Sequence, residues 1–368
     1  MSTAKPRVLY LEPFDGGSHA AFTKTLTGGV DAQWTVLTLP GRHWKWRMHG
    51  AAVLFARKHR DLLAAPYDVV FASSFIDLAH LVALAPALRE VPIILYFHEN
   101  QFAYPLRNEV KRERDNHFGM IQLVSSLVAT RCVFNSAWNR DSFLDEAEAL
   151  LRRLPDAVPK GWTAEIRAKS SVMPVPLTLP SVESGRLTET EDDRALGPII
   201  LWNHRWEFDK NPEAFFGALR HLMDRAVPFR VAVCGQRYRQ APAVFDEARG
   251  WLGDRVVHWG YAESREAYEA VLQRAHLAVS TADHEFFGVS MIEATHFGAR
   301  PLVPDRLSYP EIFPAQYRYG DGALVETLEA LCRGWRGGAP LRADRTALTT
   351  PYGPALLDRY DTLIRGLE

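Results

Sequence analysis

Two glutamates, Glu285 and Glu293, flank a short aromatic and glycine turn and have the types and spacing expected of a ligand site. Glu285 follows an apolar run that predicts a strand, and Glu293 lies within a helical pattern. A carboxylate accepts charge-assisted hydrogen bonds, so one glutamate can hold sugar hydroxyls and the other a ribose. The turn between them contains Phe286, Phe287, Gly288 and Val289. Its backbone amides are predicted to face the same ligand, although a capped helix with an exposed glutamate has the same spacing.

Two cations, Arg205 and Lys210, lie earlier in the chain, just past another predicted strand. Asn211 and Pro212 follow and have the types expected of an N-cap and a first helical position. Two cations beside a helix N-terminus are suited to a diphosphate. A solvated loop with ordinary surface charges explains this segment equally well when it is taken alone.

Polar residues also follow strands in the first half of the chain. Gly16 and Gly17 can bring the backbone close to a ligand, and Ser18 is predicted to cap the next helix. After a later strand come His98, Glu99, Asn100 and Gln101, four consecutive polar residues that are poor core material. His98 is the candidate to touch a transferred group, whereas the next three could position an acceptor. A bare turn and a structural histidine are the alternatives.

Basic and aromatic residues alternate between Gly41 and Met48. The residues of interest there are Arg42, Trp44, Lys45, Trp46 and Arg47. Further cations occur between Lys111 and Arg114. Such segments are suited to phosphate backbones and stacked bases, but a buried aromatic anchor with extended cationic side chains would look the same.

The elements that position these residues alternate between short apolar runs and amphipathic helical stretches, which predicts an α/β chain with parallel sheets. Predicted strands are Arg7–Leu11, Trp34–Leu39, Asp68–Ala72, Ile93–Phe97, Arg131–Phe134, Ile199–Trp202, Phe229–Cys234, Val256–His258, Leu277–Ser280 and Pro301–Val303. We predict a first Rossmann-like domain over 1–178, a linker over 179–197, a second Rossmann-like domain over 198–350 and a C-terminal helix over 351–368 that packs back on the first domain. Two doubly wound domains would face each other across a ligand cleft.

Composition and charge exclude several classes of protein. Lys and Arg number 43 against 44 Asp and Glu, so overall charge does not attract nucleic acid. Three widely spaced cysteines fit neither a disulfide framework nor a metal site. The N-terminus lacks the apolar stretch of a signal peptide, and no apolar run is long enough to span a membrane. A cytoplasmic protein without stable membrane association is the expectation.

The order of Arg205, Lys210, Glu285 and Glu293 resembles that of retaining GT-B glycosyltransferases, the large family that includes glycogen and sucrose synthases. The Trp-rich motifs of this sequence resemble those of a narrower family, the tRNA-queuosine mannosyltransferases. The matching stretches are Glu12–His19, Pro40–Arg47, Tyr96–Gln101, Phe134–Ser136, Leu201–Glu207, His284–Val289 and Pro304–Phe313.

The resemblance implies a GT-B fold, a GDP-mannose donor and an acceptor queuosine in the anticodon loop of aspartate tRNA, with retention of configuration. Charge relief on the leaving diphosphate by Arg205 and Lys210 can replace a metal, so no metal is expected. The wider GT-B resemblance implies diphosphate contacts for Arg205 and Lys210, a sugar contact for Glu285 and a ribose contact for Glu293. The position of His98 at a strand end makes it the further candidate to touch the sugar. The glycine loop and the turn after Glu285 complete the donor site. Acceptor contacts are expected from Ser18, His19, Glu99, Asn100, Gln101, Asn135 and the basic aromatic segment. A transferase with another nucleotide sugar or with a small-molecule or lipid acceptor, an epimerase or phosphorylase, and a catalytically silent RNA-binding module are the alternatives.

Overall fold

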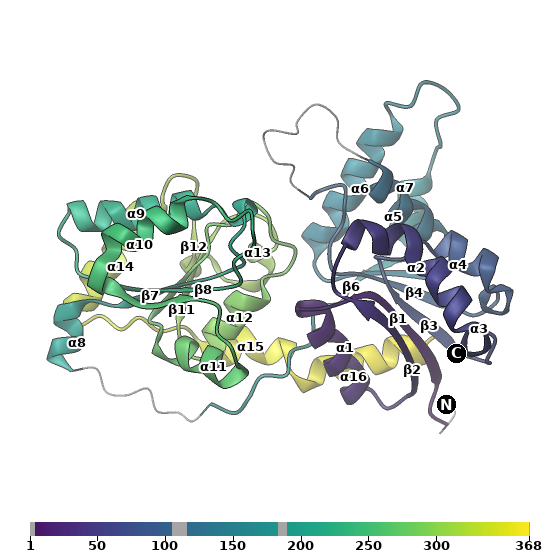
Figure 1. Ribbon diagram of the computed structural model, residues 1–368, viewed down its shortest axis with the longest axis horizontal. Helices are drawn as coiled ribbons and strands as arrows, with labels where there is room; N and C mark the ends of the chain where they lie inside the picture. The colour runs from purple at the N-terminus through teal and green to yellow at the C-terminus, as the bar shows by residue number, and fades with distance from the viewer. Residues whose placement is uncertain (1–3, 105–115, 183–189, 368) are drawn as a thin grey trace. The chain divides into compact units, whose positions relative to one another are not determined.

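The computed structural model describes residues 4–104, 116–182 and 190–367, and it divides the chain into two compact units (Figure 1). The first consists of Met1–Thr178 together with Tyr352–Glu368, and the second of Leu179–Pro351. Each unit is built on one six-stranded parallel sheet, which confirms the predicted α/β class. None of the described helices is long and apolar enough to cross a membrane.

The first sheet has the strand order β2-β1-β3-β4-β5-β6. Its strands are β1 (Arg7–Asp15), β2 (Gln33–Pro40), β3 (Val69–Ser73), β4 (Ile93–Phe97), β5 (Arg131–Phe134) and β6 (Ser170–Val172). The central strands β3 and β4 are buried throughout because helices cover both faces. The order reverses between β1 and β3, and ligands bind such sheets outside the carboxyl ends of the strands at that reversal.

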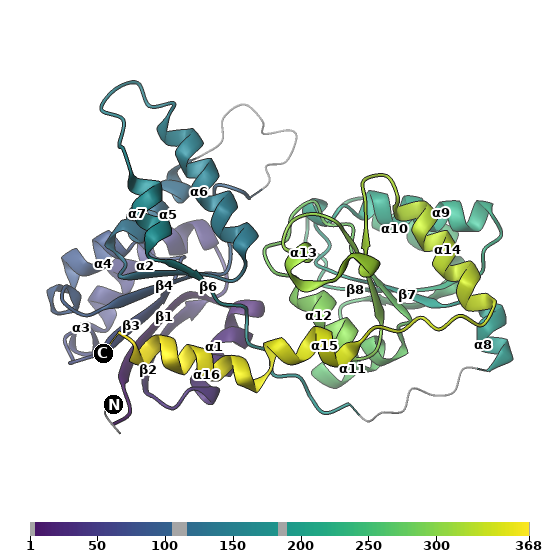
Figure 2. The same ribbon diagram turned by 180° about the vertical axis from the view of Figure 1, so that it is seen from behind.

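Two groups of helices cover this sheet (Figure 2). One face packs against α2 (Trp44–Lys58), α4 (Leu78–Leu84), α5 (His117–Val128) and α6 (Ala137–Leu151), which share an apolar core with the sheet. The other face carries α1 (Ser18–Gly29) and α16 (Pro354–Arg365). Phe22 of α1 stacks on Tyr96 of β4, with ring centroids 4.5 Å apart, and Tyr360 of α16 joins the same aromatic cluster. The C-terminal helix therefore packs back on the first unit, as predicted.

The second sheet has the order β12-β11-β10-β7-β8-β9, with its reversal between β7 and β10. Its strands are β7 (Ile199–Asn203), β8 (Arg230–Cys234), β9 (Val256–Gly260), β10 (Leu277–Val279), β11 (Arg300–Pro304) and β12 (Arg318–Tyr319). In Figure 1 one face carries α9 (Pro212–Asp224), α10 (Val244–Leu252) and α14 (Leu324–Arg336). The other face carries α11 (Arg265–Arg274), α12 (Val289–His296) and α15 (Arg345–Thr349).

The remaining described elements are short. They are α3 (Arg60–Leu63), η1 (Pro86–Leu88), α7 (Trp162–Ala168), α8 (Glu191–Leu196), η3 (Phe208–Lys210), η4 (Gly253–Arg255), α13 (Tyr309–Ile312), η5 (Ala315–Tyr317) and η6 (Thr350–Tyr352). Helix α8 lies within the range predicted as a linker. Thr190 starts it with a capping box, because its hydroxyl accepts from the amide of Asp193 and the Asp193 carboxylate accepts from the amide of Thr190.

Candidate functional site

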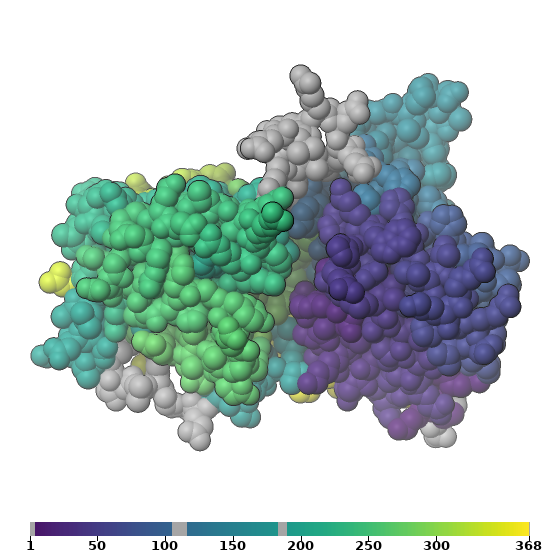
Figure 3. All heavy atoms as spheres, viewed as in Figure 1, coloured from purple at the N-terminus to yellow at the C-terminus, as the bar shows by residue number. Residues whose placement is uncertain are grey.

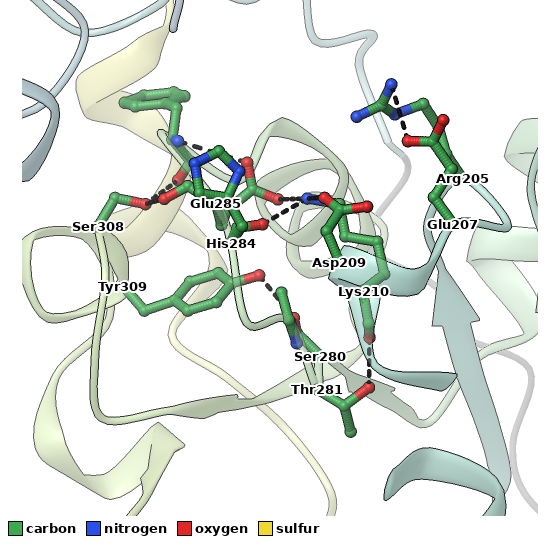
Figure 4. A network of polar contacts seen from close by, with 12 residues as sticks. Arg205, Glu207, Asp209, Lys210, Ser280, Thr281, His284, Glu285, Ser308 and Tyr309 are labelled. Carbon is green, nitrogen blue, oxygen red and sulfur yellow. Dashed lines mark hydrogen bonds and ion pairs between the residues drawn. The ribbon is translucent and has the colours of Figure 1, made fainter. Parts of the chain in front are cut away.

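Lys210 and Glu285 meet at the strand-order reversal of the second sheet (Figure 4). Lys210 ends the turn η3 after β7, and Glu285 lies in the loop after β10. The Nζ of Lys210 donates to the carbonyl oxygen of His284 at 2.6 Å and lies 3.4 Å from Oε2 of Glu285. Asn211 caps the next helix through its side chain, and Pro212 is the first helical residue, as predicted. Two residues distant in sequence are thus brought into one polar cluster.

The charge of Lys210 is fixed by its neighbours. The side chain is only 7% exposed, and this burial lowers its pKa, but Glu285 and Asp209 raise the pKa by more. Asp209 lies 3.3 Å from Nζ, and its carboxylate oxygens have no hydrogen-bond partner among the described residues. Arg205 instead forms an ion pair with Glu207 at 3.1 Å. Lys210 is therefore a buried cation between two carboxylates, whereas Arg205 is half-exposed on the same loop.

The turn between Glu285 and α12 has a fixed conformation. Gly288 is the N-cap of α12 with φ 101°, a value that favours glycine. A Cβ there would lie 3.1 Å from Cε1 of Tyr309. The hydroxyl of Ser308 donates to the carbonyl oxygens of Glu285 and Phe287, and both phenylalanines of the turn are buried. Helix α12 begins at Val289, directly beyond this turn, so its N-terminus lies beside the cluster of Lys210 and Glu285.

Glu293 lies further along α12 and is held by residues that the sequence analysis missed. Its Oε1 accepts from Nη1 of Arg265 at 2.7 Å, and its Oε2 accepts from the hydroxyl of Tyr268 at 2.9 Å. Asn203, at the end of β7, donates to the same hydroxyl at 2.7 Å. The predicted ribose ligand is therefore part of a network joining β7, α11 and α12. Spacing in the sequence contains no signal for this network, because its members meet only through folding.

In the first unit, the strand-order reversal holds a buried carboxylate, Glu12, which the sequence analysis did not single out. Its Oε1 accepts from the Phe14 amide and the Ser73 hydroxyl, both at 2.9 Å. Its Oε2 lies 3.1 Å from Nδ1 of His19 and 3.8 Å from Nε2 of His98. A charged residue within a buried strand is a signal of function, but the predicted strand Arg7–Leu11 ended one residue before Glu12, whereas β1 continues to Asp15.

The two histidines beside Glu12 have pKa values shifted in opposite directions. Burial lowers the pKa of His19, but Glu12, Glu99 and Asp15 outweigh it, so the pKa is raised. The pKa of His98 lies well below its ordinary value because the ring is buried and faces His19, with ring centroids 4.0 Å apart. Glu12, His19 and His98 also place three metal-type ligand atoms within 4.8 Å of one another. This cluster can hold a shared proton or a divalent cation, and the expected absence of a metal remains a prediction.

Most polar residues around His98 have internal hydrogen bonds. Asn135 donates to the His98 carbonyl at 2.8 Å. Asn100 donates to the carbonyl oxygen of Asn139 at 3.1 Å, and Gln101 donates to Glu99 at 2.8 Å. These contacts hold the loop that carries His98. Acceptor contacts from the same residues remain predictions.

The glycine loop after β1 differs from expectation in one detail. Gly17, with φ 54°, is the N-cap of α1, and Ser18 is its first residue without a capping hydrogen bond. The prediction that Ser18 caps this helix was therefore wrong. Gly16 approaches the next loop closely, since a Cβ added at Gly41 would lie 2.7 Å from Cα of Gly16.

The basic aromatic segment forms the start of α2, where part of it is a buried anchor and part is exposed, and its contacts with nucleic acid remain a prediction. Trp44 packs on Phe118, and Arg47 is buried with its Nε donating to the carbonyl of Pro40 at 3.2 Å. Trp46, by contrast, is 56% exposed, and Arg42 and Lys45 are also exposed. Figure 3 shows the N-terminal part of the first unit as purple spheres. The predicted cations Lys111–Arg114 lie outside the described residues.

Two Rossmann-like units, with a buried cation and two glutamates at the reversal of the second, define a GT-B glycosyltransferase. The structure is similar over 98% of the chain to Anabaena HepE in complex with UDP and glucose, with TM-score 0.67, 11% identity and 99% of that chain covered. It is also similar to sucrose-phosphate synthase from Thermosynechococcus elongatus, with TM-score 0.63, 16% identity, and 98% and 99% of the two chains covered. At these identities the likeness supports the fold alone.

Comparison of the sequence identifies the family, which the structural likeness does not. Residues 7–177 match the model of the tRNA-queuosine alpha-mannosyltransferase N-terminal domain, and residues 191–331 match that of glycosyl transferases group 1. A tRNA-queuosine alpha-mannosyltransferase from Drosophila melanogaster is 38% identical over 342 residues, which cover 90% of this chain and 89% of the relative. The chain belongs to the tRNA-queuosine alpha-mannosyltransferase family.

Proposed function

We propose that this enzyme transfers mannose from GDP-mannose to queuosine in the anticodon loop of aspartate tRNA, with retention of the anomeric configuration. Family membership supports the acceptor and the sugar. The observation that carries the donor chemistry is the buried Lys210 cation, held against Glu285 beside the N-terminus of α12. A fixed cation and a helix N-terminus stabilise charge that develops on a departing diphosphate.

In the proposed reaction, the bond between the sugar anomeric carbon and the β-phosphate oxygen breaks, and GDP leaves with the bonding electrons. The acceptor hydroxyl oxygen forms its bond to the same carbon on the same face, and its proton passes to the departing phosphate. Lys210 and Arg205 neutralise the diphosphate, Glu285 orients the sugar, and Glu293 holds the ribose. Charge relief by these side chains supports transfer without a resident metal.

The start of α2 supports an RNA acceptor. Trp46 is exposed, yet its ring lies against the helix, because a Cβ at Gly50 would come within 2.9 Å of its Cζ2. Lys45 precedes it in the sequence, with Nζ 5.6 Å from the ring centroids of Trp44 and Phe118, and the rings of His49 and His117 stack with centroids 4.6 Å apart. An exposed ring on a helix that also carries exposed basic side chains is suited to stacking on an unpaired base, which contributes about 1–3 kcal/mol per base.

The acceptor assignment is tested by binding. Trp46→Ala should weaken the affinity for queuosine-containing tRNA by about 1–3 kcal/mol and leave GDP binding unchanged. Val53→Ala is the matched control, because Val53 is 45% exposed on the same helix and has no aromatic ring. Equal tRNA affinity of the two variants would remove Trp46 from the acceptor site.

The donor assignment is tested by turnover. Release of GDP from GDP-mannose should be stimulated by tRNA carrying queuosine and not by the same tRNA carrying guanosine at that position. Stimulation by both tRNAs would contradict queuosine as the acceptor. Release from UDP-sugars in place of GDP-mannose would contradict the donor.

A further inference from the structure

The Glu293 cluster, which consists of Asn203, Arg265, Tyr268 and Glu293, lies in the second unit beyond Lys210 and Glu285. We propose that Arg265 contacts the nucleobase of the donor and selects guanine over uracil and adenine. This inference rests on the proposed function, because it takes Glu293 as the ligand of the donor ribose.

The sequence of donor-binding residues along the site places the nucleobase near Arg265. Lys210 and Glu285 mark the diphosphate and sugar end of the donor, and Glu293 marks the ribose. The diphosphate and the base leave a ribose at different carbons, so the base continues past Glu293, away from the diphosphate. Arg265 is the first residue of α11, and its Nη1 lies 2.7 Å from Oε1 of Glu293. Its side chain is 45% exposed, which leaves it accessible to a ligand.

The guanidinium of Arg265 is fixed in place and keeps unused donors. Its Nε donates to Oε1 of Glu269 at 2.6 Å, and its central carbon, Cζ, lies 5.4 Å from the ring centroid of Tyr268. An arginine has five N–H donors, and these contacts with Glu293 and Glu269 use two of them. The others have no partner among the described residues. The guanidinium of Arg265, held by Glu293 and Glu269, can therefore present two adjacent N–H donors, a fork of donors, to a ligand.

Guanine is the base that matches this fork. It offers two adjacent acceptors, O6 and N7, and paired contact with them is the commonest specific contact of arginine with a base. Adenine places an amino donor beside N7, and uracil places an N–H donor beside O4, so each would set a donor against the guanidinium. The chemistry at Arg265 therefore favours a guanosine diphosphate donor.

A competing explanation is that Arg265 only positions Glu293 through their ion pair. That role affects the ribose, which GDP, UDP and ADP share, so its loss would weaken all three nucleotides equally. Contact with the base would make the loss specific to GDP. The two explanations therefore differ in a measurable ratio of affinities.

The experiment is isothermal titration of GDP, UDP and ADP into the full chain and its variants. Wild-type protein should bind GDP most tightly. Arg265→Ala should weaken GDP binding by roughly 5- to 150-fold, the factor for one bidentate base contact, and change UDP and ADP little. Arg265→Lys should lose the preference too, because lysine keeps the charge without the fork. Arg333→Ala is the matched control, since Arg333 is 53% exposed and is paired with Glu329 at 2.8 Å on the distant helix α14.

Equal losses for all three nucleotides would overturn base selection and leave Arg265 as a positioning residue for Glu293. Unchanged GDP affinity in both Arg265 variants would overturn the inference as well. Failure of the wild-type protein to bind any of the three nucleotides would instead contradict the proposed function. Thermal melting of each variant confirms that the comparison is made between folded proteins.

Discussion

Replacement of Lys210 by methionine is expected to destabilise the second unit strongly. The Lys210 Nζ is surrounded by the His284 carbonyl at 2.6 Å, Asp209 at 3.3 Å and Glu285 at 3.4 Å. Methionine has a similar length and no charge, so the change removes the cation with little change in volume. Loss of one partner of a buried ion pair costs about 3–5 kcal/mol, because the other charge stays buried without compensation. We expect a loss of unfolding free energy in this range.

The same reasoning predicts a rescue. Asp209 is 2% exposed, and in Lys210→Met its carboxylate loses the charge that compensates it. Asp209→Asn removes the uncompensated charge, so the double variant should be more stable than Lys210→Met by about 1 kcal/mol or more. Lys169→Met is the control. Lys169 also donates to a backbone carbonyl, that of Leu127 at 2.9 Å, but its carboxylate partner Glu165 is 57% exposed, so that ion pair contributes only about 0–1 kcal/mol.

Urea denaturation followed by circular dichroism measures these differences in stability. Hydrogen exchange of peptides covering β7 and β10 locates them, because local opening near the lost charge would raise exchange there. If Lys210→Met were as stable as Lys169→Met, or if Asp209→Asn gave no recovery in the double variant, the electrostatic account of the cluster would be refuted.

Three further predictions concern the same unit. Glu285→Ala should abolish sugar transfer with an unchanged circular dichroism spectrum, and near-normal turnover would contradict its role in orienting the sugar. Gly288→Ala should be destabilising by about 1 kcal/mol and impair GDP binding, because φ is 101° and a Cβ would lie 3.1 Å from Tyr309. Gly217→Ala is the control, because Gly217 lies in open space on α9 and the change should stabilise the protein by about 0.5–1 kcal/mol. Thermal melting compares the two variants. Burial lowers the pKa of His204 from 6.5 to about 3, so the unfolded chain binds a proton that the native chain rejects, and stability should fall as pH decreases from 6.5 toward 3. His204→Phe should make this decline shallower in urea denaturation across that range, and an unchanged slope would count against the assignment.

The fold was largely predictable because buried parallel strands are continuous apolar runs. Ile93–Phe97 and Arg131–Phe134 were predicted with the bounds that the structure gives them. Ser170–Val172 and Arg318–Tyr319 were missed, since they are short edge strands with polar residues. The start of α2 at Trp44 was also missed, because Trp, Lys and Arg at its first turn resemble a loop.

The candidate site was predictable where residues follow strand ends and less so where contacts arise between elements. Lys210 and Glu285 were expected at one ligand, and the structure places them 3.4 Å apart. Arg265 and Tyr268 reach Glu293 from another helix, so only the packing of α11 on α12 reveals them. The cap expected from Ser18 failed because the positive φ of Gly17 starts the helix one residue earlier.

The measurement that tests the central claim most directly is the mass of the nucleoside product. The purified chain is incubated with GDP-mannose and queuosine-containing aspartate tRNA, and the tRNA is digested to nucleosides for mass spectrometry. We predict that queuosine gains the mass of one hexose, and that it gains none with Glu285→Ala. Queuosine of unchanged mass after incubation with wild-type protein that binds GDP would contradict the proposed transfer.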